Sequence, residues 1–348
     1  MPAALTRSTI MSTALCAAAA WVHAQSPDPL FTVRDGGGTA RASVHGTGAL
    51  YVGGAYDNTV FTPVAPVEGA GTRLVWVPEK AAFRVGQVTG TQWDSTNLGD
   101  YSFAAGLDTR ALGAHAVAFG NGSVAAGGAS FAAGDTNTAS GAASVALGYH
   151  AHTNARQGSF VFSDRSSVDE VRAGVNHSAN WRVSGGFRIF TSSNLSTGVT
   201  IQSGASVSNW GQASAVISTS TGAMLTTGGV WQNASDVNRK HLFAPVDGEA
   251  VLARLRSVPI QEWSYRAEPD EVRHLGPTSQ DFRAAFGLGQ DDKSIGTVDA
   301  DGVALAGVQA LDARTLRQGD EIAALRAENQ ALRERLAAIE RALGAAGQ

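Results

Sequence analysis

The feature that most constrains this 348-residue chain is a glycine repeat with a period of seven residues. An alanine stands two residues before each glycine of the series Gly106, Gly113, Gly120, Gly127, Gly134, Gly141 and Gly148. A stronger period of fourteen lies over it, in which Phe103, Val117, Phe131 and Val145 are equivalent. A fixed period indicates stacked units, each of which buries its apolar face against its neighbours.

Two repeat folds compete for this pattern. In a coiled coil each glycine would cost about 1 kcal/mol, and the leucine-type seam is missing. Short strands such as Ser130–Gly134 alternate between two faces, glycines suit corners with positive φ, and alanines suit a narrow interior. A β-roll or β-helix is therefore favoured. A calcium-binding β-roll, which is the alternative, would need an aspartate in most turns. The turns carry Asp108, Asn121 and Asp135, and the pattern does not persist. No metal or cofactor is predicted.

The segments on either side of the repeat are also β-type. Residues 25–100 are Gly-rich, and Leu74–Val77 before Pro78 is their best strand. The repeat itself occupies 101–155, and a β-rich shaft follows over 156–232. Three tryptophans of the shaft are better explained as buried packing residues than as sugar platforms; they are Trp181, Trp210 and Trp231.

The N-terminus has the pattern of a secretory signal peptide over residues 1–24. Arg7 precedes an apolar run, Met11–Val22, and small residues follow it. The run is short for a membrane anchor, which is the alternative. Cys16, the one cysteine, lies inside it. We therefore expect a secreted or cell-surface protein without disulfides or later transmembrane segments, and the net charge of -4 argues against a nucleic-acid partner.

The repeat over Tyr101–Ala155 resembles the head of trimeric autotransporter adhesins, on its Ser-x-Ala-x-Gly pattern. The resemblance implies left-handed parallel β-rolls with three chains side by side. It also implies a homotrimer, whose fibre could bind a host-surface or glycan receptor.

After Lys240 the composition changes, and a small α+β domain is expected over 233–320. Helices are predicted at Glu249–Arg256, Gln280–Phe286 and Val303–Leu311, and a strand at Ile260–Tyr265.

The last segment, 321–344, has an apolar seam at steps of three and four. Its members are Ile322, Leu325, Asn329, Leu332, Leu336, Ile339 and Leu343. A parallel oligomeric coiled coil is favoured over a helix packed on its own domain, because the seam is narrow and uninterrupted. Asn329 stands at an a position, where one polar residue fixes the register.

Ser235 and Lys240 can form a hydrolytic pair. The hydroxyl would attack a carbonyl while the lysine, once neutral, accepts the proton. Burial or a cation such as Arg239 would favour the neutral lysine. A spacing of five places the two side chains on one face of neither a helix nor a strand, so they must meet across a turn, through water or between chains.

An ordered set of motifs surrounds the pair. It comprises Ser235-Asp236-x-Asn238-x-Lys240, Pro259-Ile260-x-x-Trp263-x-Tyr265, Arg273-His274-x-Gly276-Pro277, Gln280-Asp281-Phe282, Phe286-Gly287-Leu288 and Val298–Leu305. This region resembles the C-terminal intramolecular chaperone of phage tailspikes and tail fibres, the self-cleaving endosialidase type. The resemblance implies that the domain trimerises, guides folding of the preceding β-structure and cuts the Ala234–Ser235 bond.

Carried over from that family, Ser235 is the nucleophile and Lys240 the general base of an autocatalytic serine endopeptidase. Asp236 and Asn238 match the motif without an assigned role, and His274 is interpreted as structural. The alternatives are an uncleaved structural or adhesive fibre with an inert chaperone domain, and an enzyme that acts on an external glycan.

Overall fold

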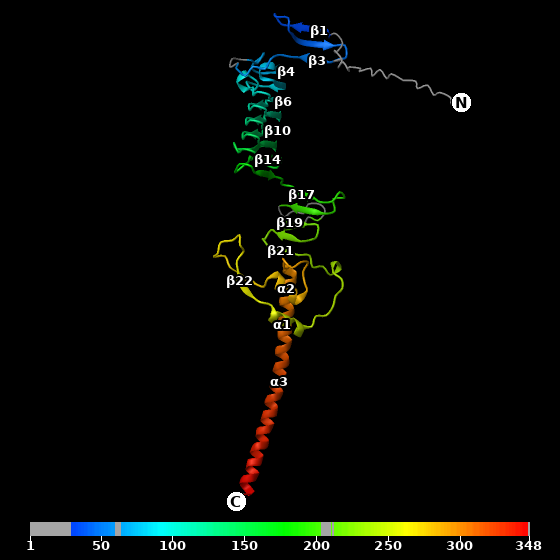
Figure 1. Ribbon diagram of the computed structural model, residues 1–348, viewed down its shortest axis with the longest axis vertical. Helices are drawn as coiled ribbons and strands as arrows, with labels where there is room; N and C mark the ends of the chain where they lie inside the picture. Colours follow the sequence, from blue (N-terminus) through cyan, green and yellow to red (C-terminus); the bar gives the residue numbers. More distant parts are fainter. Residues whose placement is uncertain (1–28, 60–63, 203–209, 211, 347–348) are drawn as a thin grey trace, which may run out of the picture. The chain divides into compact units, whose positions relative to one another are not determined.

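The computed structural model describes residues 29–59, 64–202, 210 and 212–346 (Figure 1). The predicted signal peptide and Cys16 lie outside these residues. Two compact units are present: Met1–Arg188 with Ile201–Ser203, and Ile189–Thr200 with Gly204–Gln348. The chain is mostly β with a long C-terminal helix, as predicted. No helix in the described ranges is long and apolar enough to span a bilayer.

The first unit is built of short strands and two 3-10 turns. They are β1 (Pro29–Arg34), β2 (Ala40–His45), β3 (Leu50–Val52), β4 (Gly71–Val77), η1 (Pro78–Lys80), β5 (Ala82–Val88), η2 (Ser95–Asn97), β6 (Phe103–Leu107), β7 (Arg110–Ala111), β8 (Val117–Asn121), β9 (Val124–Ala125), β10 (Phe131–Asp135), β11 (Thr138–Ala139), β12 (Val145–Tyr149), β13 (Ala151–His152), β14 (Phe160–Ser163), β15 (Val171–Arg172) and β16 (Ala179–Arg182). Strands β1 to β3 form an antiparallel sheet of their own.

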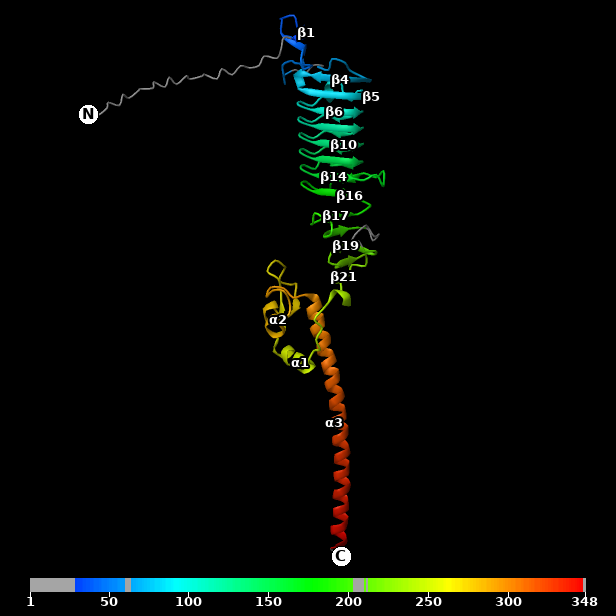
Figure 2. The same ribbon diagram turned by 90° about the vertical axis from the view of Figure 1, so that its right-hand side faces the viewer.

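The repeat becomes two sheets that run side by side, in which every strand pairing except the antiparallel one between β4 and β5 is parallel. One has the order β16-β14-β12-β10-β8-β6-β5-β4 and the other β15-β13-β11-β9-β7. Each fourteen-residue repeat places one strand in each sheet, and equivalent residues pair, as Phe131 does with Val117 and with Val145. Figure 2 shows these strands stacked one above the next. We call this region, 99–163, the repeat stack.

The seven-residue glycine period has a steric cause. A methyl group on Gly106, Gly120 or Gly134 would lie 2.0–2.2 Å from the carbonyl oxygen of the glycine one repeat later. The same holds for Gly113 and Gly127 in the alternate position, at 2.0–2.1 Å. Successive coils therefore touch backbone to backbone at both glycine columns, and any side chain there would separate them.

The alanines that precede the glycines fill the interior of the repeat stack. The interior set Ala104, Ala111, Ala118, Ala125, Ala132, Ala139 and Ala146 is fully buried. Their small volume matches the narrow space between the sheets, as the sequence indicates. Buried hydroxyls line the corners: Ser144 donates to the Gly141 carbonyl over 2.7 Å.

The corners differ from expectation in one respect. Positive φ was expected at glycines, but many left-handed corner positions carry other residues, such as Tyr101, His115, Ala129 and Ala143. Gly113 and Gly127 are not left-handed. At those two positions the requirement is close backbone approach instead of conformational freedom.

Arg84 and Trp93 close the N-terminal end of the interior. The Arg84 guanidinium donates to the carbonyls of Ser102 and Ala111 at 3.1 and 3.0 Å, and the Trp93 indole donates to the Thr109 carbonyl at 2.8 Å. Both side chains are buried. Burial lowers the pKa of Arg84 to about 10, so it remains a cation at neutral pH. These side chains therefore donate to carbonyls just before β6 and at β7, and the Ser102 and Ala111 carbonyls accept backbone amides as well.

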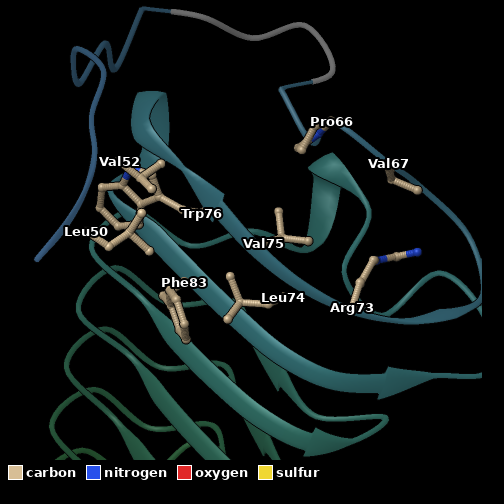
Figure 3. A pocket seen from close by; sticks show the side chains of 9 residues that line it. All are labelled: Leu50, Val52, Pro66, Val67, Arg73, Leu74, Val75, Trp76 and Phe83. Atoms are coloured by element: carbon tan, nitrogen blue, oxygen red, sulfur yellow. The ribbon is translucent and has the colours of Figure 1, made fainter. Parts of the chain in front are cut away.

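The outer face of the larger sheet is apolar along its length. Two columns of paired residues run across the strands: Trp76, Phe83, Phe103, Val117, Phe131, Val145 and Phe160, beside Leu74, Val85, Ala105, Phe119, Ala133, Leu147, Phe162 and Trp181. We call this set the outer apolar face. Ring contacts such as Phe83–Phe103 at 5.2 Å join successive strands. At its β4 end a cavity of about 580 Å³ is lined by Leu50, Val52 and Trp76 (Figure 3).

Most of a five-stranded sheet belongs to the second unit. Its order is β17-β18-β19-β20-β21, with β17 (Phe187–Phe190), β18 (Gly198–Ile201), β19 (Ala215–Thr219), β20 (Met224–Thr226) and β21 (Trp231–Gln232). Trp210 packs edge-on against Phe190 at 5.7 Å. Trp181 and Trp231 are exposed in the single chain, so the prediction that they are buried is wrong for these two.

The small domain that follows contains short elements with clear end signals. They are η3 (Val237–Arg239), α1 (Gly248–Ser257), β22 (Gln261–Trp263), β23 (His274–Gly276) and α2 (Ser279–Phe286). Asp247 caps α1 by accepting from the Glu249 and Ala250 amides, and Thr278 caps α2. Gly287 ends α2 in the left-handed region, as the sequence pattern indicates. The predicted α1 and α2 helices are confirmed.

The last helix, α3 (Thr297–Ala346), is one continuous element. The sequence predicts it as two separate pieces, Val303–Leu311 and a heptad segment from 321. Gly307, inside the first piece, faces α1, where a methyl group would lie 2.7 Å from Leu255. That glycine serves close helix packing, which outweighs its helix propensity of about 1 kcal/mol.

Candidate active site

The segment between β21 and α1 holds the predicted motif. Every residue from Trp231 to Asp247 is exposed in the single chain, although several are apolar. Leu242 and Phe243 are 88% and 70% exposed. Such a surface is unusual for a stable monomer.

Asp236 organises the start of this segment. Its Oδ1 accepts the Asn238 amide at 2.9 Å and the Asn238 side-chain Nδ2 at 3.0 Å. The backbone then closes a 3-10 turn, in which the Lys240 amide donates to the Val237 carbonyl at 3.1 Å. The two motif residues without a predicted role therefore build a turn. An aspartate commonly accepts the backbone amide two residues further on, and this turn signature could have indicated the arrangement.

The turn brings Lys240 back onto Ser235. Nζ of Lys240 donates to Oγ of Ser235 over 2.7 Å. The spacing of five is bridged across a turn within one chain, which is one of the three routes that the sequence left open. Ala234 precedes the serine directly, so its carbonyl carbon lies next to the hydroxyl in the chain.

This arrangement can support one type of reaction. A neutral amine in hydrogen-bond reach of a hydroxyl can take its proton during attack on a carbonyl. Both side chains are exposed in the single chain.

His274 lies in a separate aromatic cluster. Its Nε2 is 3.0 Å from Oε2 of Glu268, and its ring centroid is 4.7 Å from that of Trp263 and 5.4 Å from that of Tyr265. These contacts fix the hairpin of β22 and β23. The structural interpretation of this histidine accords with them.

Helices α1 and α3 are clamped by charge as well as by packing. Glu249 at the start of α1 pairs with Arg314 and Arg317 of α3. The hydrogen bond from Arg314 is the main cause of a pKa of Glu249 below its ordinary value. On the α3 face toward α1, Val303 and Ala310 are buried, and a methyl group on Gly248 would lie 2.8 Å from Ala310.

The predicted seam of α3 is not covered by any described part of the same chain. Its apolar members from Ile322 to Leu343 are all about half exposed or more. Asn329 donates to the Leu325 carbonyl of its own helix at 2.9 Å. Val308 and Leu311, which continue the same register toward the N-terminus, are exposed too.

Comparison with known families bears on this region. Residues 235–287 match the family described as chaperone of endosialidase. The match begins at Ser235, includes Lys240 and ends at Gly287, which terminates α2. No curated protein and no solved structure matches the chain. From Ser235 to the end of α2, the chain is thus similar to the chaperone domain of the endosialidase type.

Proposed function

We propose that this chain is a secreted fibrous protein whose C-terminal domain is an intramolecular trimerisation chaperone that cuts itself off at Ala234–Ser235. The observation that carries the cleavage proposal is the 2.7 Å contact between Lys240 and Ser235, inside the segment that matches the chaperone family. The domain suggests a tail-fibre-like product, and the repeat suggests an adhesin-like head.

The proposed cleavage has two steps. Oγ of Ser235 attacks the Ala234 carbonyl carbon and gives its proton to the neutral Lys240 amine. The C–N bond then breaks, the departing Ser235 nitrogen takes the proton from Lys240, and an ester joins Ala234 to Oγ. Water attacks the ester carbonyl, which leaves the Ala234 carboxylate and frees the Ser235 hydroxyl.

A homotrimer is supported by two unpartnered apolar surfaces. One is the α3 seam, whose narrow a/d spacing suits helix association. The other is the outer apolar face, which presents aromatic residues from successive strands. Three copies that bury both surfaces could also bury the Ser–Lys pair, and burial would favour the neutral lysine.

The order of folding explains why such a domain would help. The repeat stack is built of parallel strands whose edges stay open until the next strand pairs with them, and open strand edges are prone to aggregation during folding. A helical coiled coil forms from local contacts and sets three chains in register. Cleavage then removes that template, so the product cannot unfold by the same route.

A second candidate is an uncleaved structural or adhesive fibre with an inert chaperone domain. The exposure of Ser235 and Lys240 in the single chain favours this candidate, because the reaction needs a neutral amine and the single chain lacks the burial that favours one. In both candidates the protein is exported through the signal peptide to the cell surface or medium. The N-terminal fibre would contact a host-surface or glycan receptor.

Denaturing electrophoresis with intact mass separates the candidates. Wild type is compared with Ser235→Ala and Lys240→Ala. A C-terminal fragment that starts at Ser235, in wild type alone, supports self-cleavage by this pair. One full-length band in all three leaves the chaperone and removes the peptidase.

A further inference from the structure

The turn between β19 and β20 touches the residues that flank the Ser–Lys pair. Gly222 in this turn has φ +87, and its amide donates to the Thr219 carbonyl at 3.0 Å. A methyl group on Gly222 would lie 2.4 Å from Nη1 of Arg239 and 3.0 Å from Cβ of Ala234. The side chains of Arg239 and Ala234 therefore occupy the space that a side chain at position 222 would fill.

These two residues matter because of their places in the motif. Ala234 carries the carbonyl of the bond to be cut, and Arg239 directly precedes Lys240. The exposed segment has few other anchors: Nδ2 of Asn233 donates to Oγ1 of Thr297 at 3.3 Å. The contact at Gly222 thus holds two residues in one place: Ala234, which carries the carbonyl of the bond, and Arg239, which is next to Lys240.

We infer that the β19–β20 turn is the docking point of the cleavage site, with Gly222 and Arg239 as positioning residues for Ser235 and Lys240. The inference rests on the proposed self-cleavage. Gly222 provides the open space, and the long Arg239 side chain ties the Asp236 turn to the sheet. Neither residue exchanges a proton with the reacting atoms.

The docking point makes cleavage depend on the sheet. The Asp236 turn closes through neighbours in sequence and can form in a partly folded chain. The Gly222 turn exists only where β19 pairs with β20, as in Ser218 with Met224. The Ala234–Ser235 bond is therefore held against the Ser–Lys pair only after the sheet that contains β19 and β20 has formed. Cleavage would then occur only in chains whose shaft has folded up to this last sheet.

The test is Gly222→Ala beside a matched control, Gly229→Ala. Gly229 has a similar left-handed φ of +79 in the turn after β20, but a methyl group there meets nothing within 4 Å. Both variants carry the same backbone strain, and only the first displaces Arg239 and Ala234. We expect Gly222→Ala to slow fragment release about 10²-fold and Gly229→Ala to change it by less than about threefold, with unchanged oligomeric state.

Arg239→Ala keeps the inference falsifiable if Gly222→Ala folds poorly. It should slow release to a similar degree, and Arg239→Lys should restore part of the rate. The double variant should be no slower than the slower single variant, because both changes break one contact. Additive losses that follow the melting temperature would indicate general destabilisation and overturn the inference.

Failure of the inference and failure of the proposed function give different results. If wild type releases the fragment and both Gly222→Ala and Arg239→Ala release it equally fast, the docking point is wrong while self-cleavage stands. If wild type never releases the fragment, self-cleavage fails, and the inference fails with it.

Discussion

Lys240 reaches Ser235 across a turn, with Nζ 2.7 Å from Oγ. The lysine can act as a base only in its neutral form, whereas arginine keeps its proton over the accessible pH range. Lys240→Arg should therefore abolish fragment release, while wild type releases the fragment. Time courses by intact mass on the two proteins check this. Release by the arginine variant would remove Lys240 as the base.

Asp236 should act through the turn. Asp236→Ala removes the acceptor for both Asn238 donors, so Lys240 would lose its fixed approach to Ser235. We expect release to fall about 10- to 100-fold, and Asp236→Asn, which keeps an acceptor oxygen, to retain more of the rate. Equal rates for the two variants would mean that the turn needs no side-chain acceptor.

The glycine columns should be intolerant of any side chain. In Gly120→Ala the new methyl group would lie 2.1 Å from the Gly134 carbonyl oxygen. We expect a loss of at least about 2 kcal/mol in unfolding free energy, measured by denaturant titration. Gly128→Ala is the control, because its methyl group would meet only the Ala114 carbonyl at 3.9 Å and should be nearly neutral.

Arg84 should contribute to stability as a donor. Arg84→Met keeps the length of the side chain but removes the charged hydrogen bonds to the Ser102 and Ala111 carbonyls, at a cost of roughly 1.5–3 kcal/mol. Both carbonyls keep a backbone amide donor, from Phe83 and Gly99. Arg110→Met, at an exposed position on β7, is the matched control. The melting temperatures of the two variants should separate clearly; coincident values would show that water replaces the guanidinium.

The clamp between α1 and α3 should give an acid-sensitive step. Because Arg314 lowers the folded-state pKa of Glu249 from 4.5, its contribution is present above about pH 4.5 and is lost as the pH falls through the lower folded value. Glu249→Gln should lower the melting temperature at pH 7 and should weaken the fall of the melting temperature as the pH drops below about 4.5. Glu328→Gln, exposed on α3, should leave both unchanged.

The seam of α3 should decide the oligomeric state. Leu332→Lys places a charge on the seam, and we expect the assembly to dissociate in light scattering. Ala327→Lys changes an apolar residue to lysine on the opposite side of the same helix, so it should leave the assembly intact. If both variants dissociate, or if neither does, the hypothesis that the copies associate through the α3 seam is wrong.

How far the sequence predicts this molecule depends on whether a residue belongs to a pattern. The alanine and glycine period predicts the interior because each repeated alanine, such as Ala132, pairs with the equivalent alanine of the next repeat. Arg84 occurs once, at the end of the stack, so no period indicates it. The stretch between the two predicted pieces of α3 was missed because polar Thr315 and Gln318 interrupt the apolar seam. The packing of Gly307 against Leu255 is a tertiary effect that no sequence pattern indicates.

At the candidate site the residue types were predictable and the anchoring was not. Ser235 and Lys240 stand in a recognisable motif, and Asp236 with Asn238 carries a local turn signature. Gly222 lies far from the motif in sequence, and only folding of β19 onto β20 brings it to Arg239 and Ala234.

The equal register of successive repeats leaves the stack without a built-in length. A coil such as β10 with β11 contacts the coils before and after it through equivalent residues, so a fourteen-residue unit can be inserted or removed without new chemistry at either junction. Each insertion would lengthen the stack by one strand spacing, about 4.8 Å. The length of the repeat stack can thus change in evolution by duplication of a repeat in the gene. Neither Arg84 at the end of the stack nor the C-terminal domain needs to change.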